Sequence, residues 1–111
     1  MKAPIPEPKN IFDRTNFEDI VEDDVAELEE AYVSYGDSWR KRGGVGAFMM
    51  LARKWDRLEN KVKEYDWDIF EAIDEDPREE GILDDIRDLR RYLLLVDEFI
   101  NDKEKYDEYS T

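Results

Sequence analysis

The C-terminal half of the chain carries an apolar seam, and this feature constrains the fold more than any other. Isoleucine, leucine and valine recur alternately four and three residues apart, at Ile82, Ile86, Leu89, Leu93, Val96 and Ile100. This spacing matches one face of an α-helix and predicts a helix over residues 82–102. The apolar–polar alternation of a half-buried strand is nowhere sustained. We therefore expect an all-α fold.

Other segments have the same periodicity. The pattern predicts long helices over residues 16–35 and 45–65, a short helical segment over 67–73, and a glycine-rich loop over 37–46. The helix over 45–65 is expected to bury one face, which consists of Val45, Phe48, Met49, Ala52, Trp55, Leu58, Val62 and Tyr65. Trp67 is also expected in the core. The predicted architecture is a small helical bundle of three long helices plus one short helix.

The chain has 111 residues, which is enough for one domain. Residues 1–15, with prolines at positions 4, 6 and 8, predict an extended N-terminal arm. Residues 16–102 form the predicted bundle, and 103–111 a polar C-terminal tail that is expected to fray. Tyr92, Leu94, Leu95 and Phe99 widen the apolar seam beyond what so small a core can hide. This excess predicts that the protein is a homo-oligomer.

Charge and composition exclude several kinds of chemistry. The absence of cysteine and histidine excludes disulfides, thiol catalysis, imidazole bases and zinc sites of these ligands. The net charge of −14 disfavours direct binding to nucleic acid or to an anionic membrane. No apolar run is long enough to span a membrane, and the N-terminal residues do not read as a secretory signal, so we expect a cytoplasmic protein. Residues 36–63 nevertheless hold eight cations against three anions, a local charge of +5.

The segregated cations suggest a site for a small anion. Glycines beside cations, just before a helix begins, suit phosphate, while aromatic rings can stack on a base or sugar. The candidate ligand-binding residues are Tyr35, Asp37, Ser38, Trp39, Arg40, Lys41, Arg42, Lys54 and Arg57. Two plainer interpretations stay open: the loop only links two helices, and the cations of residues 45–65 only pair with acidic helices.

Two pairs of carboxylates form a candidate metal site. Glu27 and Glu30 share one face of the first helix, as do Asp85 and Asp88 on the last. If these helices are neighbours, the four side chains could hold Mg²⁺. The alternative is that the acids are surface charges that complement helix dipoles. No cofactor is expected, apart from Mg²⁺ if the protein is an enzyme.

The order of three motifs resembles a known family. The segment Tyr35-Gly36-Asp37-Ser38-Trp39, then Lys54-x-x-Arg57-Leu58, then the Asp-rich segment 84–93 are similar to the small phage and bacterial nucleotide modification associated domains. The resemblance covers residues 17–100 and implies a helical fold, a phage setting and a link to nucleotide metabolism.

A more distant likeness is to all-α nucleoside triphosphate pyrophosphatases of the MazG and dUTPase type. Those enzymes hold Mg²⁺ with Glu-x-x-Glu and Glu-x-x-Asp. Glu27-x-x-Glu30 matches the first motif, whereas Asp85-x-x-Asp88 has the shorter aspartate where glutamate is usual. Because aspartate is shorter, the two helices would have to lie closer together for these carboxylates to hold Mg²⁺.

Three functions follow as hypotheses. The preferred one is a phage-type protein that binds a nucleotide or nucleotide-derived signalling molecule and sequesters a host immune signal in the bacterial cytoplasm. The second is a Mg²⁺-dependent nucleotide pyrophosphatase. The third is an acidic DNA mimic that inhibits a host protein, whose binding would weaken steeply with salt. We favour binding over catalysis because it uses the segregated cations and does not need the altered carboxylate motif.

Overall fold

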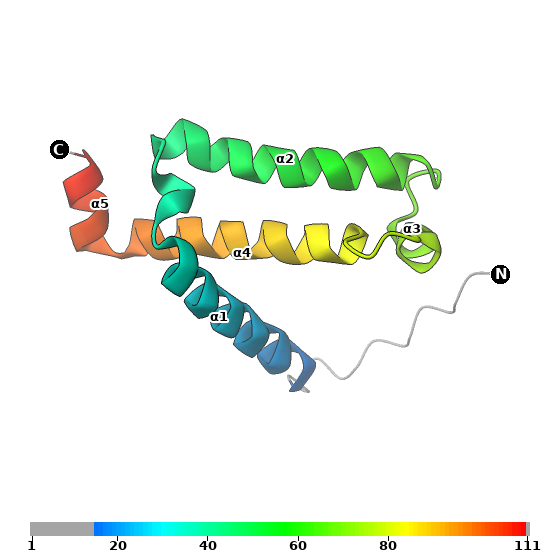
Figure 1. The fold of residues 1–111 in the computed structure, drawn as a ribbon, viewed down its shortest axis with the longest axis horizontal. Helices are drawn as coiled ribbons and strands as arrows, with labels where there is room; N and C mark the ends of the chain where they lie inside the picture. The colour runs from blue at the N-terminus through cyan, green and yellow to red at the C-terminus, as the bar shows by residue number, and fades with distance from the viewer. Residues whose placement is uncertain (1–14, 111) are drawn as a thin grey trace.

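The computed structural model describes residues 15–110, which form helices joined by short loops (Figure 1). In chain order these are α1 (Thr15–Tyr35), the 3₁₀-helix η1 (Ser38–Arg40), α2 (Gly43–Lys63), α3 (Ile69–Glu75), α4 (Ile82–Asn101) and α5 (Lys103–Ser110). The predicted all-α bundle is confirmed, with no strand among the described residues. Most of the predicted N-terminal arm, residues 1–14, lies outside them. None of the described helices is both long and apolar enough to cross a lipid bilayer.

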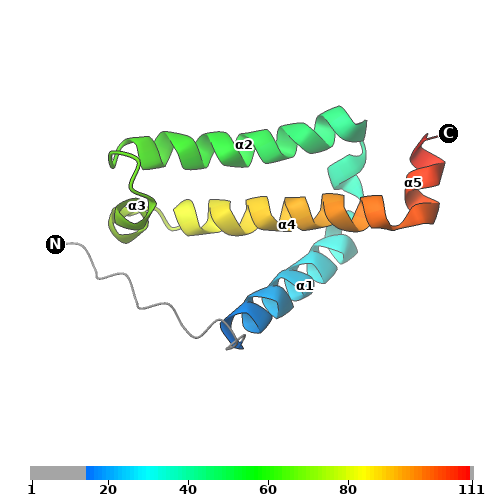
Figure 2. The same cartoon turned by 180° about the vertical axis from the view of Figure 1, so that it is seen from behind.

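The centre of the fold is a pair of long helices. α2 and α4 lie side by side and run in opposite directions, and α3 closes one end of the pair (Figures 1 and 2). α1 meets α4 near the C-terminal end of α1 and diverges from it toward residue 15 (Figure 2). The fold is therefore an α2–α3–α4 unit against which α1 leans along only part of its length.

The hydrophobic core lies where α2, α3 and α4 meet. The side chains of Leu58, Val62, Ala72 and Ile82 are buried together, and Tyr65, Ile69, Ile73 and Ile86 pack around them. The seam predicted on α4 is thus buried at its N-terminal end. Farther along α4, Leu93 and Ile100 are each more than half exposed.

The buried face of α2 is rotated relative to the predicted one. Val45, Phe48, Met49 and Trp55 are each more than half exposed, so the prediction that they are buried is wrong. Lys54 and Arg57 of α2 instead contact carboxylates of α4. This rotation places two cations of α2 opposite two acidic side chains of α4.

The turn between α2 and α3 contains two residues whose backbone has positive φ, which residues other than glycine rarely adopt. Asp66 has φ 54° and Trp67 has φ 66°, and the Trp67 N–H donates to the carbonyl of Val62 at 3.1 Å. Asp68 then starts α3, where its Oδ1 accepts hydrogen bonds from the N–H groups of Phe70 and Glu71. Trp67 is exposed, so its predicted place in the core is also wrong.

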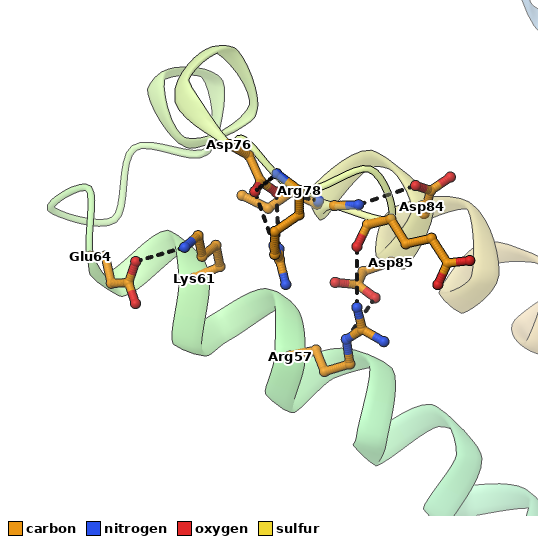
Figure 3. A network of polar contacts seen from close by, with 10 residues as sticks. Arg57, Lys61, Glu64, Asp76, Arg78, Asp84 and Asp85 are labelled. Atoms are coloured by element: carbon orange, nitrogen blue, oxygen red, sulfur yellow. Dashed lines mark hydrogen bonds and ion pairs between the residues drawn. The ribbon is translucent and has the colours of Figure 1, made fainter.

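A carboxylate holds the corner between α3 and α4 (Figure 3). Asp76 Oδ2 accepts a hydrogen bond from the N–H of Ile82 at 2.8 Å, and both Asp76 oxygens accept from the Arg78 guanidinium at 2.9 Å. The side-chain hydrogen bond from Arg78 is the main reason that the pKa of Asp76 lies far below its usual range. A Cβ on Gly81 would lie 2.4 Å from Asp76 Oδ2, so this approach requires glycine. The corner fixes where α4 begins.

The C-terminal segment, which the sequence predicts to be a polar tail, forms a short helix. Residues 103–110 form α5, whose Tyr106 N–H donates to the carbonyl of Asp102 at 3.0 Å. The Tyr106 ring meets the Phe99 ring edge to face, with centroids 6.0 Å apart. Phe99 is consequently buried, and it does not contribute to the exposed apolar patch expected on α4.

Candidate functional site

The segment between α1 and α2 forms one side of a hollow. α1 ends at Tyr35 because Gly36 adopts φ +57°, which glycine does without steric cost, and the Gly36 N–H donates to the carbonyl of Tyr32 at 2.7 Å. The carbonyl of Asp37 then accepts from the N–H of Arg40, which makes the single turn of η1. Trp39 in this turn packs edge to face on Phe99 of α4, with centroids 5.9 Å apart.

Four of the predicted ligand-binding residues line the same cavity. Its volume is about 120 Å³. The predicted residues in its wall are Tyr35, Asp37, Ser38 and Trp39, and the others are Leu28, Ala31, Tyr32, Gly36, Tyr92 and Leu95. Aromatic rings with a few polar groups are the usual lining of small-molecule sites. Sequence reasoning missed Tyr92 as a site residue, because its spacing assigns it to the apolar face of α4.

A second cavity, of about 200 Å³, continues the first along the junction of α1 and α4. It shares Leu28, Ala31, Tyr92 and Leu95 with the first, and adds Glu27, Asp88 and Arg91. We call the two cavities together the α1–α4 groove. Their combined size is at the lower limit of typical ligand pockets, about 300 Å³.

Asp24 joins α1 to α4 beside the groove. This buried carboxylate accepts hydrogen bonds from Arg90 at 2.6 and 2.7 Å and from Arg91 Nε at 2.9 Å. The hydrogen bonds from Arg90 are the largest cause of its lowered pKa, against the opposing effect of burial. The contact orients Arg91, whose other N–H groups make no hydrogen bond within the described residues. Sequence reasoning missed this ion pair. The available signal was that Asp24 lies on the apolar face of the helix predicted over residues 16–35, where an acid is unexpected.

The three cations of the loop are not brought together at the groove. The Arg40 guanidinium lies 4.8 Å from the centroid of the Phe99 ring and pairs with Asp37 at 3.2 Å. Lys41 and Arg42 are exposed, and neither lines the groove. The structure therefore places aromatic residues of the loop at the cavity and directs its cations elsewhere.

Lys54 and Arg57 are already paired with α4. Lys54 Nζ lies 2.8 Å from Asp88 Oδ2, and Arg57 Nε lies 3.3 Å from Asp85 Oδ1. The interpretation that these cations pair with an acidic helix is confirmed. We therefore leave them out of the ligand site, although the sequence predicts them there.

The four predicted metal ligands do not converge. Glu27 and Asp88 both line the groove, but Asp88 is paired with Lys54. Asp85 is buried against α2, and Glu30 is exposed on α1. Among residues 15–110, no group of three or more carboxylates is arranged to hold a metal ion. The reason is that α1 contacts α4 along only part of its length, whereas Asp85 and Asp88 form ion pairs with the cations of α2.

No family model, no curated protein and no solved structure matches this chain. The resemblances drawn from the motifs therefore stay predictions, and the function has to be argued from the groove itself.

Proposed function

We propose that this protein binds a nucleotide or a nucleotide-derived signalling molecule in the α1–α4 groove and holds it without turnover. One observation carries the proposal: the Tyr35–Trp39 segment lines a cavity together with Tyr92, and Arg91 lines the adjoining part of the same groove. Aromatic rings stack on nucleobases with little sequence preference, and a guanidinium is the preferred donor to phosphate.

The groove suggests how such a ligand would lie. The base stacks against Tyr35, Trp39 or Tyr92, and a phosphate accepts from the N–H groups of Arg91 that Asp24 leaves unused. The exposed Lys41 and Arg42 attract the anion over a longer distance.

Retention is favoured over hydrolysis because the carboxylates that an enzyme would need are engaged elsewhere. Asp88 pairs with Lys54, and Asp85 is buried beside Arg57. With the phage setting that the sequence resemblance implies, stoichiometric binding would sequester a host immune signal and block the response it triggers.

The proposal predicts saturable binding to one member of a nucleotide panel in calorimetry with nucleoside phosphates and cyclic di- and trinucleotides. Trp39→Ala is expected to weaken that binding by about 5- to 150-fold, because one base–aromatic stack contributes about 1–3 kcal/mol. Trp55→Ala is the matched control, since Trp55 is exposed on α2 outside the groove and should bind like the wild type. Chromatography after incubation with Mg²⁺ should recover the ligand intact. Absence of heat with every member, or equal affinity of the two variants, would overturn the proposal.

We also propose that a second copy of the chain covers the apolar face beside the groove. α1 and α4 form a broad hollow there, of about 730 Å³, lined by Val25, Leu28, Glu29, Tyr32, Val33, Leu94, Leu95 and Glu98. Another copy offers a complementary surface on α2, where exposed Val45 and Met49 share a face with Arg42 and Arg53. The two arginines of that surface are complementary in charge to the two glutamates of the hollow. An interface between two different surfaces of the chain gives a ring when successive copies return to the first.

This arrangement predicts an oligomer at micromolar concentration in sedimentation velocity. Val33→Glu, which adds a charge to the most exposed apolar side chain of the hollow, should convert the oligomer to monomer with unchanged helix content. Val21→Glu makes the same change at an exposed valine of α1 outside the hollow and should leave the oligomer intact. A monomeric wild type would contradict the interface.

A further inference from the structure

A polar cavity between α2 and α4 lies apart from the aromatic end of the groove. Its volume is about 170 Å³, and charged side chains make up its whole lining: Lys54, Arg57, Glu80, Asp84, Asp85 and Asp88. Four carboxylates thus face two cations. The nucleotide proposed above finds no ring here on which to stack, so this cavity calls for a different ligand.

Asp85 is the least satisfied group in this cavity. Its side chain is 1% exposed, and its Oδ2 makes no hydrogen bond within the described residues. Figure 3 shows the carboxylate turned toward Arg57 of α2. Burial raises the pKa of Asp85, against the opposing charges of Arg57 and Lys54. A buried carboxylate oxygen of this kind requires a donor.

Neither cation in the cavity supplies that donor. Arg57 is shared, since its Nε lies 3.3 Å from Asp85 Oδ1 while its Nη2 donates to the carbonyl of Glu80 at 3.3 Å (Figure 3). The ammonium of Lys54 is held by Asp88 at 2.8 Å. Asp84 Oδ2 accepts from the N–H of Gly81 and so belongs to the start of α4. We therefore look for the missing donor to Asp85 Oδ2 in a ligand from outside this network.

We propose that this cavity binds the ammonium group of a small primary amine, with Asp85 Oδ2 as the principal acceptor. An ammonium is compact and carries three N–H donors, so one can donate to Asp85 while the others stay hydrated or meet one neighbouring carboxylate of the lining. Its positive charge offsets the excess of acids in the lining. The cavity is large enough for an ammonium on a short alkyl chain.

Other cations fit less well. A divalent metal ion needs several oxygen ligands at once, and the part of the chain that the structure describes holds no such carboxylate group. A guanidinium pairs best with both oxygens of a carboxylate, but Asp85 Oδ1 already faces Arg57. The ammonium needs only one free oxygen.

The test is a titration of the ¹⁵N-labelled full chain with 1,4-diaminobutane at constant ionic strength, followed by amide chemical shifts. Saturable shifts are expected at Gly81–Asp85, the segment from which Asp84 and Asp85 enter the cavity. Asp85→Asn should weaken binding at least tenfold, because it removes the acceptor charge and retains the shape. Asp23→Asn, at an exposed acid of α1, is the charge-matched control and should change affinity less than twofold.

Three results would overturn the site. One is equal binding by the Asp85 and Asp23 variants, and another is the same shift pattern with 1,4-butanediol, which has the shape of the amine without its charge. The third is an equivalent response to Mg²⁺ at matched ionic strength, which would indicate unspecific attraction to an acidic protein. If Asp85→Asn does not fold, Glu80→Gln at the exposed rim replaces it, with an expected weakening of two- to fivefold.

Discussion

Replacing Asp24 with alanine is expected to lower the free energy of unfolding by about 3 kcal/mol. Removal of one partner of a buried ion pair costs about 3–5 kcal/mol. We take the lower end because Arg90 and Arg91 are partly exposed and can be hydrated once the carboxylate is lost. Because few other contacts hold α1 against α4, the loss should fall mainly on the docking of α1. Urea unfolding followed by circular dichroism measures the change.

The pH dependence of this difference identifies its cause. The folded state lowers the pKa of Asp24, so the ionised carboxylate stabilises the fold above its unfolded pKa of about 4. That contribution is lost as the pH falls toward the lower pKa of the folded state. The gap between wild type and Asp24→Ala should therefore be full at pH 7 and narrow below about pH 4. Asp23→Ala is the neighbouring control, and an equal loss of stability there would contradict the role of Asp24.

Replacing Ile82 with alanine is expected to lower the free energy of unfolding by about 3 kcal/mol. Ile82 is almost completely buried among Leu58, Val62 and Ala72, and removal of a buried isoleucine to alanine costs about 2–5 kcal/mol. Alanine retains the backbone N–H that donates to Asp76 at the start of α4, so the loss reports the buried side chain. Since small domains have total stabilities of about 5–15 kcal/mol, the loss should be plain in chemical denaturation.

Leu83→Ala provides the comparison. Leu83 is the next residue of α4 and is exposed, so its truncation should cost less than about 1 kcal/mol. Similar costs at positions 82 and 83 would mean that the core does not lie where α2, α3 and α4 meet.

Much of the secondary structure could be predicted from periodicity. The long helices end within about two residues of their expected positions, because apolar spacing and Gly36 are local signals. The turn at Asp66 and Trp67 was harder to predict, since positive φ is uncommon outside glycine and a tryptophan gives no signal for it. α5 was missed because a short polar segment carries little periodicity.

Part of the candidate site could also be predicted from the sequence, and part could not. Tyr35, Asp37, Ser38 and Trp39 are neighbours in sequence, so a single turn brings them to one cavity. Tyr92 and Arg91 join them only because α1 leans on α4, a contact between segments more than fifty residues apart. Lys54 and Arg57 were predicted to bind a ligand because the sequence gives their charge. It does not show that they lie beside the carboxylates of α4 with which they pair.

By itself, the sequence determined the helices, the loop that carries the aromatic residues, and the charge available to each segment, since these depend on composition and on short-range spacing. The tertiary structure alone decided which charges are neutralised, because the rotation of α2 against α4 turns Lys54 and Arg57 toward Asp88 and Asp85. It also decided where space remains, since the angle of α1 opens the groove beside Tyr92 and the corner at Asp76 sets α4 so that Asp85 is buried with one oxygen unsatisfied. Packing angles depend on all the contacts of a helix at once, and no local pattern in the sequence records them.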